Sequence, residues 1–166
     1  MAEKQQWANQ IFQVVCVVHD LNQTLENWKR MVEFDQSSIK LGTTAPDAKC
    51  RYRGQEISCP VRYARFDLGG IDMKLVEPLN KTGGDPYSDT LQSKGQGFHH
   101  IGIYVQDRDS LIAQYQAMGI TPVYEEIDSE KQYLLYDFCR EIGMVIAPWS
   151  RMVGPCGGRD PQGKTK

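Results

Sequence analysis

The sequence lacks a strong charge of either sign. Its 166 residues carry 19 Lys and Arg against 21 Asp and Glu, which gives a formal net charge of -2. Proteins that bind nucleic acid or an anionic membrane surface carry a broad basic field. We therefore expect neither nucleic acid nor a membrane as a partner, and instead expect a small-molecule ligand in a local pocket.

Long apolar runs are also absent. No stretch approaches the roughly 20 apolar residues that cross a bilayer, and the polar start lacks the hydrophobic segment of a signal peptide. Five cysteines are scattered without a Cys-x-x-Cys pair, which argues against a disulfide framework and a structural zinc site. These features predict a cytoplasmic protein with reduced thiols.

What the chain does contain is a repeated segment. Residues 12–21 form an apolar, strand-like run that leads into a helical pattern, and residues 99–108 have the same layout. Aligning the two segments places Gln13 opposite His100 and Asp20 opposite Asp107. An internal repeat of a strand-then-helix unit predicts two half-domains of one architecture, with functional groups where their sheets meet.

The pattern after each repeated strand predicts a helix and three more strands. Asp20 and Asp107 are expected to cap the helices, of which the first should end near residues 33–34 and the second at Gly119. The further strands are expected at residues 38–41, 61–68 and 71–78, and then at 121–127, 132–138 and 144–147.

The remaining segments are expected to connect these elements. Residues 42–60 are predicted to form a loop that borders a site, and residues 80–97 a linker. We expect a single domain over residues 1–150, with modules at 11–79 and 98–150. Residues 151–166 are predicted to be a flexible tail.

Two successive strand–helix–strand–strand–strand units resemble the vicinal oxygen chelate superfamily, which includes glyoxalases, bleomycin-resistance proteins, extradiol dioxygenases and methylmalonyl-CoA epimerases. The most specific stretches are residues 71–79 (IDMKLVEPL) and 88–101 (SDTLQSKGQGFHHI), which are similar to the epimerase branch. The resemblance covers about residues 11–150. It implies an α+β fold, in which two tandem βαβββ modules form a cupped mixed sheet with helices on the convex side, and it implies a homodimer.

In that family, the first and fourth strands of each module supply the ligands of a divalent metal. The matching positions here are Gln13, Lys74, His100 and Ala147. His100 is a strong metal ligand and Gln13 a weak one, whereas an alanine methyl has no lone pair and a protonated lysine repels a dication. We therefore expect either no cofactor or a divalent metal held incompletely by His100 and Gln13. Because the Ala147 position holds an acid/base glutamate in the epimerase branch, its loss argues against the epimerase reaction.

Residues two apart on a strand share a face, and this alternation predicts the residues of the site. It places Gln13 on the inner face of the first strand, and Phe98, His100 and Tyr104 on that of the second. We predict that Gln13, Tyr104 and Phe98 bind the ligand. His100 and Lys74 are the candidate catalytic residues, as a general base and as the stabiliser of an enolate-like oxygen. His99 is expected at the rim or at an interface.

Simpler interpretations stand beside these. His100 could be a buried histidine bonded to its neighbours, the aromatic residues could be ordinary core, and Lys74 could pair with Glu77 or Asp72. A lysine that faces the cup would instead favour an anionic or carbonyl oxygen, and desolvation would lower its pKa toward base or Schiff-base chemistry. Between these two roles, the sequence favours anion binding.

The preferred function is therefore that of a glyoxalase-like or methylmalonyl-CoA epimerase-like protein with a degraded metal site. It would bind a small organic acid or acyl compound, with activity of the isomerase or lyase type. The alternative is a non-catalytic protein that binds a hydrophobic ligand, as bleomycin-resistance proteins do. A third hypothesis is a metal-dependent epimerase whose ligands come from other residues, such as Glu77 or Glu141.

Overall fold

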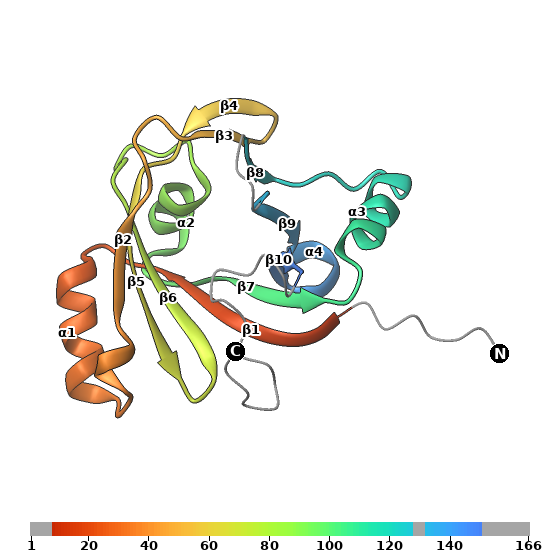
Figure 1. Ribbon diagram of the computed structural model, residues 1–166. Coiled ribbons are helices and arrows are strands. Elements are labelled where there is room, and N and C mark those ends of the chain that lie inside the picture. The colour runs from red at the N-terminus through yellow and green to blue at the C-terminus, as the bar shows by residue number, and fades with distance from the viewer. Residues whose placement is uncertain (1–7, 128–131, 151–166) are drawn as a thin grey trace.

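The computed structural model describes residues 8–127 and 132–150. Within them lie ten strands, four α-helices and a short 3-10 helix (Figure 1). The strands are β1 (Ala8–Val17), β2 (Lys40–Thr43), β3 (Lys49–Tyr52), β4 (Gln55–Ser58), β5 (Val61–Leu68), β6 (Ile71–Pro78), β7 (Gly97–Val105), β8 (Tyr124–Glu126), β9 (Leu134–Phe138) and β10 (Met144–Trp149). The helices are α1 (Leu21–Met31), η1 (Gln36–Ser38), α2 (Pro86–Lys94), α3 (Arg108–Ala117) and α4 (Cys139–Ile142).

Aspartate side chains cap the N-termini of three of the α-helices. Asp20 accepts a hydrogen bond from the amide of Gln23 at α1, and Asp107 accepts one from the amide of Ser110 at α3. Both caps confirm the prediction, since a carboxylate satisfies amides that the helix itself leaves without acceptors. Asp85 does the same at α2, where Pro86 occupies the first turn.

The strands form one mixed sheet in the order β2-β5-β6-β1-β7-β10-β9-β8-β3-β4. Its centre is the antiparallel pair β1 and β7, flanked by β6, which is parallel to β1, and by β10, which is parallel to β7. Outside them, β5 and β9 are antiparallel to β6 and β10. The pairing therefore follows the same scheme on both sides of the β1–β7 junction.

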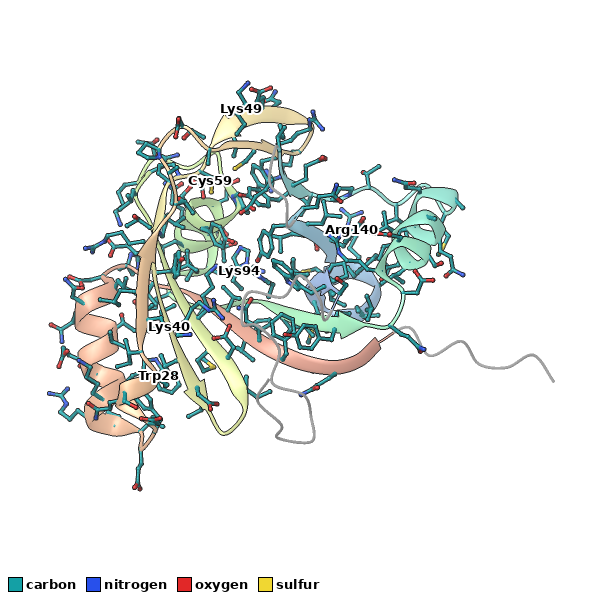
Figure 2. All side chains as sticks on the ribbon, in the orientation of Figure 1. Trp28, Lys40, Lys49, Cys59, Lys94 and Arg140 are labelled. Atoms are coloured by element: carbon teal, nitrogen blue, oxygen red, sulfur yellow. The ribbon has the colours of Figure 1, made fainter. Side chains whose placement is uncertain are left out.

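The curled sheet has two differently packed faces. On the outer face, α1 packs against β5 and β6, while Leu111 of α3 packs against Ile101 and Ile103 of β7. In Figure 2, Trp28 of α1 lies between the helix and the strands, where its ring is 5.3 Å from that of Phe66. The inner face carries an apolar cluster, here called the inner cluster, that includes Phe12, Val15, Val17, Tyr87, Tyr104, Tyr133, Ala147 and Trp149. The expected α+β fold with a cupped mixed sheet is therefore confirmed.

Several local predictions were wrong. Residues 42–60 contain the hairpin of β3 and β4, which extends the sheet by pairing with β8. The expected linker contains α2, which contributes Tyr87 and Leu91 to the inner cluster and so does not lie on the convex side. Figure 1 shows α2 between the arm of β2, β5 and β6 and the hairpin of β3 and β4.

The end of the first helix also differs from the prediction, since α1 ends at Met31, before residues 33–34. The predicted tail at 151–166 lies outside the described residues.

Among the described residues, no helix is long and apolar enough to span a membrane.

Candidate functional site

A cavity of about 190 Å³ lies against the inner face of the sheet, and we call it the Lys74 cavity. Strands β1, β5, β6, β8 and β10 contribute to its wall, together with α2 and the loops around β3 and β4. Its lining comprises Gln13, Thr44, Cys59, Val61, Tyr63, Arg65, Lys74, Tyr87, Tyr124, Glu126, Tyr133 and Trp149. Figure 2 shows the part of this region around Cys59, close to α2 and β3.

Lys74 has no ion-pair partner among the described residues, although the carboxylate of Glu126 on the cavity wall attracts it electrostatically. Its side chain forms no hydrogen bond or ion pair with any residue that the structure describes, and its Nζ instead lies 4.8 Å from the centre of the Tyr63 ring and 6.0 Å from that of Tyr133. Burial and, to a smaller extent, the positive charge of Arg65 together lower the pKa of Lys74 to about 8. The simpler interpretation, in which Lys74 pairs with Glu77 or Asp72, is therefore wrong.

A neighbouring network explains why Asp72 does not form an ion pair with Lys74. Arg65 lies directly opposite Lys74 on β5 and forms an ion pair of 2.9 Å with Asp72. The same carboxylate accepts a hydrogen bond of 2.6 Å from Nε2 of Gln13 on β1. Asp72 is thus occupied by an arginine and an amide, and Lys74 faces a like charge across the strand pair.

His100 lies behind the cavity wall and is fully buried. Its Nε2 is 2.5 Å from the hydroxyl of Tyr133, its Nδ1 is 2.6 Å from Nδ1 of His99, and Nε2 of His99 is 3.0 Å from the carbonyl of Pro86. A carbonyl only accepts, so His99 donates from Nε2 and accepts at Nδ1 when neutral. His100 must then donate from Nδ1 and accept the Tyr133 proton at Nε2.

Burial keeps both histidines of this chain of hydrogen bonds neutral. Burial lowers the pKa of His99 to about 4, and burial together with the neighbouring His99 lowers the pKa of His100 well below its usual value of 6.5. Tyr133 is also hydrogen bonded to Tyr87 of α2. The chain therefore links β7, the segment before β9 and the start of α2, and it leaves neither nitrogen of His100 free.

His99 was expected at a rim or interface, and this was wrong because α2 covers it. Its side chain is 8% exposed, and its ring lies 4.8 Å from that of Tyr87. The alternation of faces failed at this position because the pairing of β7 with β1 is irregular here: Val15 lies opposite His100 but Cys16 lies opposite Phe98, so His99 is skipped in the ladder.

The structure separates the other predicted site residues. Tyr104 faces inward as expected and stacks on Phe12 at 4.0 Å, but it lines a second cavity of about 280 Å³ near the β5–β6 hairpin. Phe98, predicted to face inward, is 48% exposed and does not line the Lys74 cavity. Gln13 and Lys74 are therefore the two predicted residues that the cavity brings together. The roles of all these residues stay predictions.

Two side chains of the cavity were not predicted. Glu126 of β8 lines it and attracts Lys74 electrostatically. Trp149 of β10 is 4% exposed, and its Nε1 is buried without a hydrogen-bond partner among the described residues. The strand expected at 121–127 held a signal, because Tyr124 and Glu126 are two residues apart and so share a face.

The two glutamates of the third hypothesis lie elsewhere. Glu77 is occupied by Arg62, Lys81 and the amide of Leu21, and Glu141 is exposed on α4. Within residues 8–127 and 132–150, no three His, Cys, Asp or Glu side chains lie close enough together to hold a metal ion.

Comparison with known proteins identifies the family. The model of the Glyoxalase/Bleomycin resistance protein/Dioxygenase superfamily matches residues 12–136. The chain therefore belongs to this superfamily, which is also called the vicinal oxygen chelate superfamily. No curated protein sequence matches the chain.

Solved structures with the same fold include several methylmalonyl-CoA epimerases. A variant of the Streptomyces coelicolor enzyme in complex with 2-nitronate-propionyl-CoA superimposes with a TM-score of 0.60 at 18% identity, covering 88% of this chain and 97% of the enzyme. The Mycobacterium tuberculosis enzyme gives 0.59 at 17% identity, with 90% and 92% covered. A hypothetical protein of Bacillus halodurans gives 0.59 at 19% identity, with 85% and 93% covered. At these identities the likeness shows the fold alone.

The neutral histidine pair predicts that acid destabilises the fold. Below a pH of about 6.5, histidines of the unfolded chain take up protons, whereas His99 and His100 cannot do so until their lower folded pKa values are reached. We expect the free energy of unfolding to fall by about 2 kcal/mol per histidine between pH 7 and pH 5. Urea denaturation at both pH values measures this fall. The variant His99→Gln should show a clearly smaller loss, and an equal loss in both proteins would contradict the assignment.

Proposed function

We propose that the chain binds a small organic acid or acyl compound in the Lys74 cavity and acts on it as an enzyme of the isomerase or lyase type. The observation that carries the proposal is the uncompensated amine of Lys74, which lies over aromatic rings in a cavity. A partly buried cation without an ion-pair partner favours an anionic ligand or a ligand oxygen that becomes negative during a reaction. The cytoplasmic location and the homodimer implied by the family resemblance belong to the same proposal.

The residues at the four positions that match the family's metal ligands support a reaction without a divalent metal. His100 has its Nε2 lone pair engaged by Tyr133, and Gln13 donates its amide to Asp72. Ala147 has no donor atom, and Lys74 presents a cation when it is protonated. These residues do not fit a dication, because a stable site needs several lone pairs directed at one point.

The size of the cavity limits the ligand. Pockets for drug-sized ligands have volumes of about 300–1,000 Å³, and the Lys74 cavity is smaller, at about 190 Å³. It suits a short acid or the acyl end of a longer compound.

The residues around the cavity can perform a proton transfer next to a carbonyl group. Glu126 supplies a carboxylate that can take a proton from the α-carbon, and the Lys74 ammonium can stabilise the enolate oxygen that forms. The same carboxyl group can return the proton to a neighbouring carbon of the enolate, which completes an isomerisation with a single acid/base residue. Trp149 Nε1 supplies a further hydrogen-bond donor for a ligand oxygen.

Substitution of Lys74 tests the binding step. We expect Lys74→Met, which keeps the length of the side chain but removes its charge, to weaken binding of lactate about tenfold or more, since a hydrogen bond to a charged group contributes roughly 1.5–3 kcal/mol. Lys74→Arg keeps the charge and should retain most of the affinity. Isothermal titration calorimetry measures both. If the wild-type chain and Lys74→Met bind lactate equally, the charge of Lys74 does not hold the acid.

Non-catalytic binding is the second candidate, because the Tyr133–His100 hydrogen bond leaves His100 without a free basic nitrogen. Exchange of the α-protons of a short thioester, S-ethyl propanethioate, in deuterated water separates the two functions. An enzyme that moves a proton next to a carbonyl should accelerate the exchange, and Glu126→Gln should abolish the acceleration. A binder would be stabilised against heat by the thioester but would leave the exchange rate unchanged.

A further inference from the structure

Lys74 has the surroundings of a nucleophilic amine. A lysine paired with a carboxylate keeps its proton and offers no lone pair, but the only carboxylate on the adjacent part of the strand, Asp72, is occupied by Arg65 and Gln13. The other close neighbours of the Lys74 amine are the rings of Tyr63 and Tyr133. A ring face carries no negative charge, so it does not hold the proton on the amine as a carboxylate would. Nothing among the described residues therefore blocks the nitrogen from the cavity.

We propose that Lys74 condenses with the carbonyl carbon of a small 2-oxo acid and forms an imine in this cavity. The nitrogen lone pair attacks the carbonyl carbon, and the carbonyl oxygen becomes a hydroxyl group. The nitrogen then loses a proton and the hydroxyl group leaves as water, so that the reaction is an amine plus a carbonyl giving an imine plus water, with no oxidant or reductant. This inference rests on the proposed function, because it places an organic acid in the same cavity.

The lining of the cavity favours a 2-oxo acid over a simple aldehyde. The buried Nε1 of Trp149 has no partner among the described residues, and its ring lies 5.2 Å from that of Tyr133, which also neighbours Lys74. An indole N–H is a donor only, so it suits the carboxylate of a ligand whose carbonyl is at Lys74. The guanidinium of Arg65, directly opposite Lys74, adds positive charge on the same side.

Glu126 completes the chemistry of the condensation. Its carboxylate lines the cavity and attracts Lys74 electrostatically. It can take the proton that the nitrogen loses and deliver it to the departing hydroxyl group, which is the role of a general acid and base. The lowered pKa of Lys74, about 8, leaves a substantial fraction of the amine unprotonated in mildly alkaline solution.

Reductive trapping with pyruvate tests the inference. The full chain is incubated with pyruvate and sodium cyanoborohydride at pH 8, and peptide mass spectrometry locates the N-(1-carboxyethyl) group left by the reduced imine. We expect modification at Lys74 at least tenfold faster than at the exposed Lys40, which serves as the internal control. Lys74→Arg should lose this modification, and Lys40→Arg should not. Trp149→Phe should slow trapping at Lys74 severalfold without moving it to another lysine.

A parallel titration separates failure of the inference from failure of the proposed function. Lactate has the carboxylate of pyruvate but no carbonyl, so it reports acid binding alone. If lactate and pyruvate bind and trapping at Lys74 is no faster than at Lys40, the imine is ruled out and the binding function stands. If neither acid binds and no selective trapping occurs, both are overturned. Because the site is mapped in the wild-type chain, the result does not depend on whether Lys74→Arg folds.

Discussion

The antiparallel pairing of β1 with β7 is the constraint on which the rest of the structure depends. It places Val15 opposite His100 and Gln13 opposite Gly102, and it allows β6 and β10 to join on the two sides. The pair packs closely, because a Cβ at position 102 would lie 3.0 Å from Gln13 and from the Phe12 ring. Through β6, the same pairing places Lys74 beside Val15, on the strand next to the junction.

Of the charged side chains near this junction, some have an ion-pair partner and one does not. Asp72 joins Gln13 and Arg65 across three neighbouring strands, which leaves Lys74 with a like charge opposite and only ring faces as close neighbours. A cation over a ring is stabilised by about 0.5–2 kcal/mol, which is less than the cost of removing the charge from water. The imbalance is reduced if the ammonium loses its proton or if an anionic ligand enters, and both outcomes underlie the proposed chemistry.

Local patterns in the sequence predicted eight of the ten strands of the sheet, all but β3 and β4, and two of the helix starts. Alternation correctly assigned Gln13 and Tyr104 to the inner face. Alternation gives the face of a residue but not its position along the cup. Tyr104 therefore shares the inner face with Ala147 and yet lines the second cavity near the β5–β6 hairpin.

The least predictable part was α2, because most of its nine residues are polar and it follows a segment rich in glycine. The pair Asp85 and Pro86 was the signal, since an aspartate cap followed by proline in the first turn is typical of a helix start. Missing this helix also hid Tyr87 and the burial of His99. No local pattern could show that Lys74 lacks an ion-pair partner. Asp72 is taken up by residues of two other strands, Gln13 of β1 and Arg65 of β5, and this contact depends on how the three strands pair.

The pKa of the Lys74 amine tests the central claim most directly. Titration of a chain with isotope-labelled lysine, followed by nuclear magnetic resonance at the side-chain carbon next to Nζ and assigned with Lys74→Arg, measures it in solution. Burial and the neighbouring arginine predict a pKa of about 8. A value near the ordinary 10.5 would show that Lys74 is solvated or paired, and it would contradict both the cavity amine and the chemistry proposed for it.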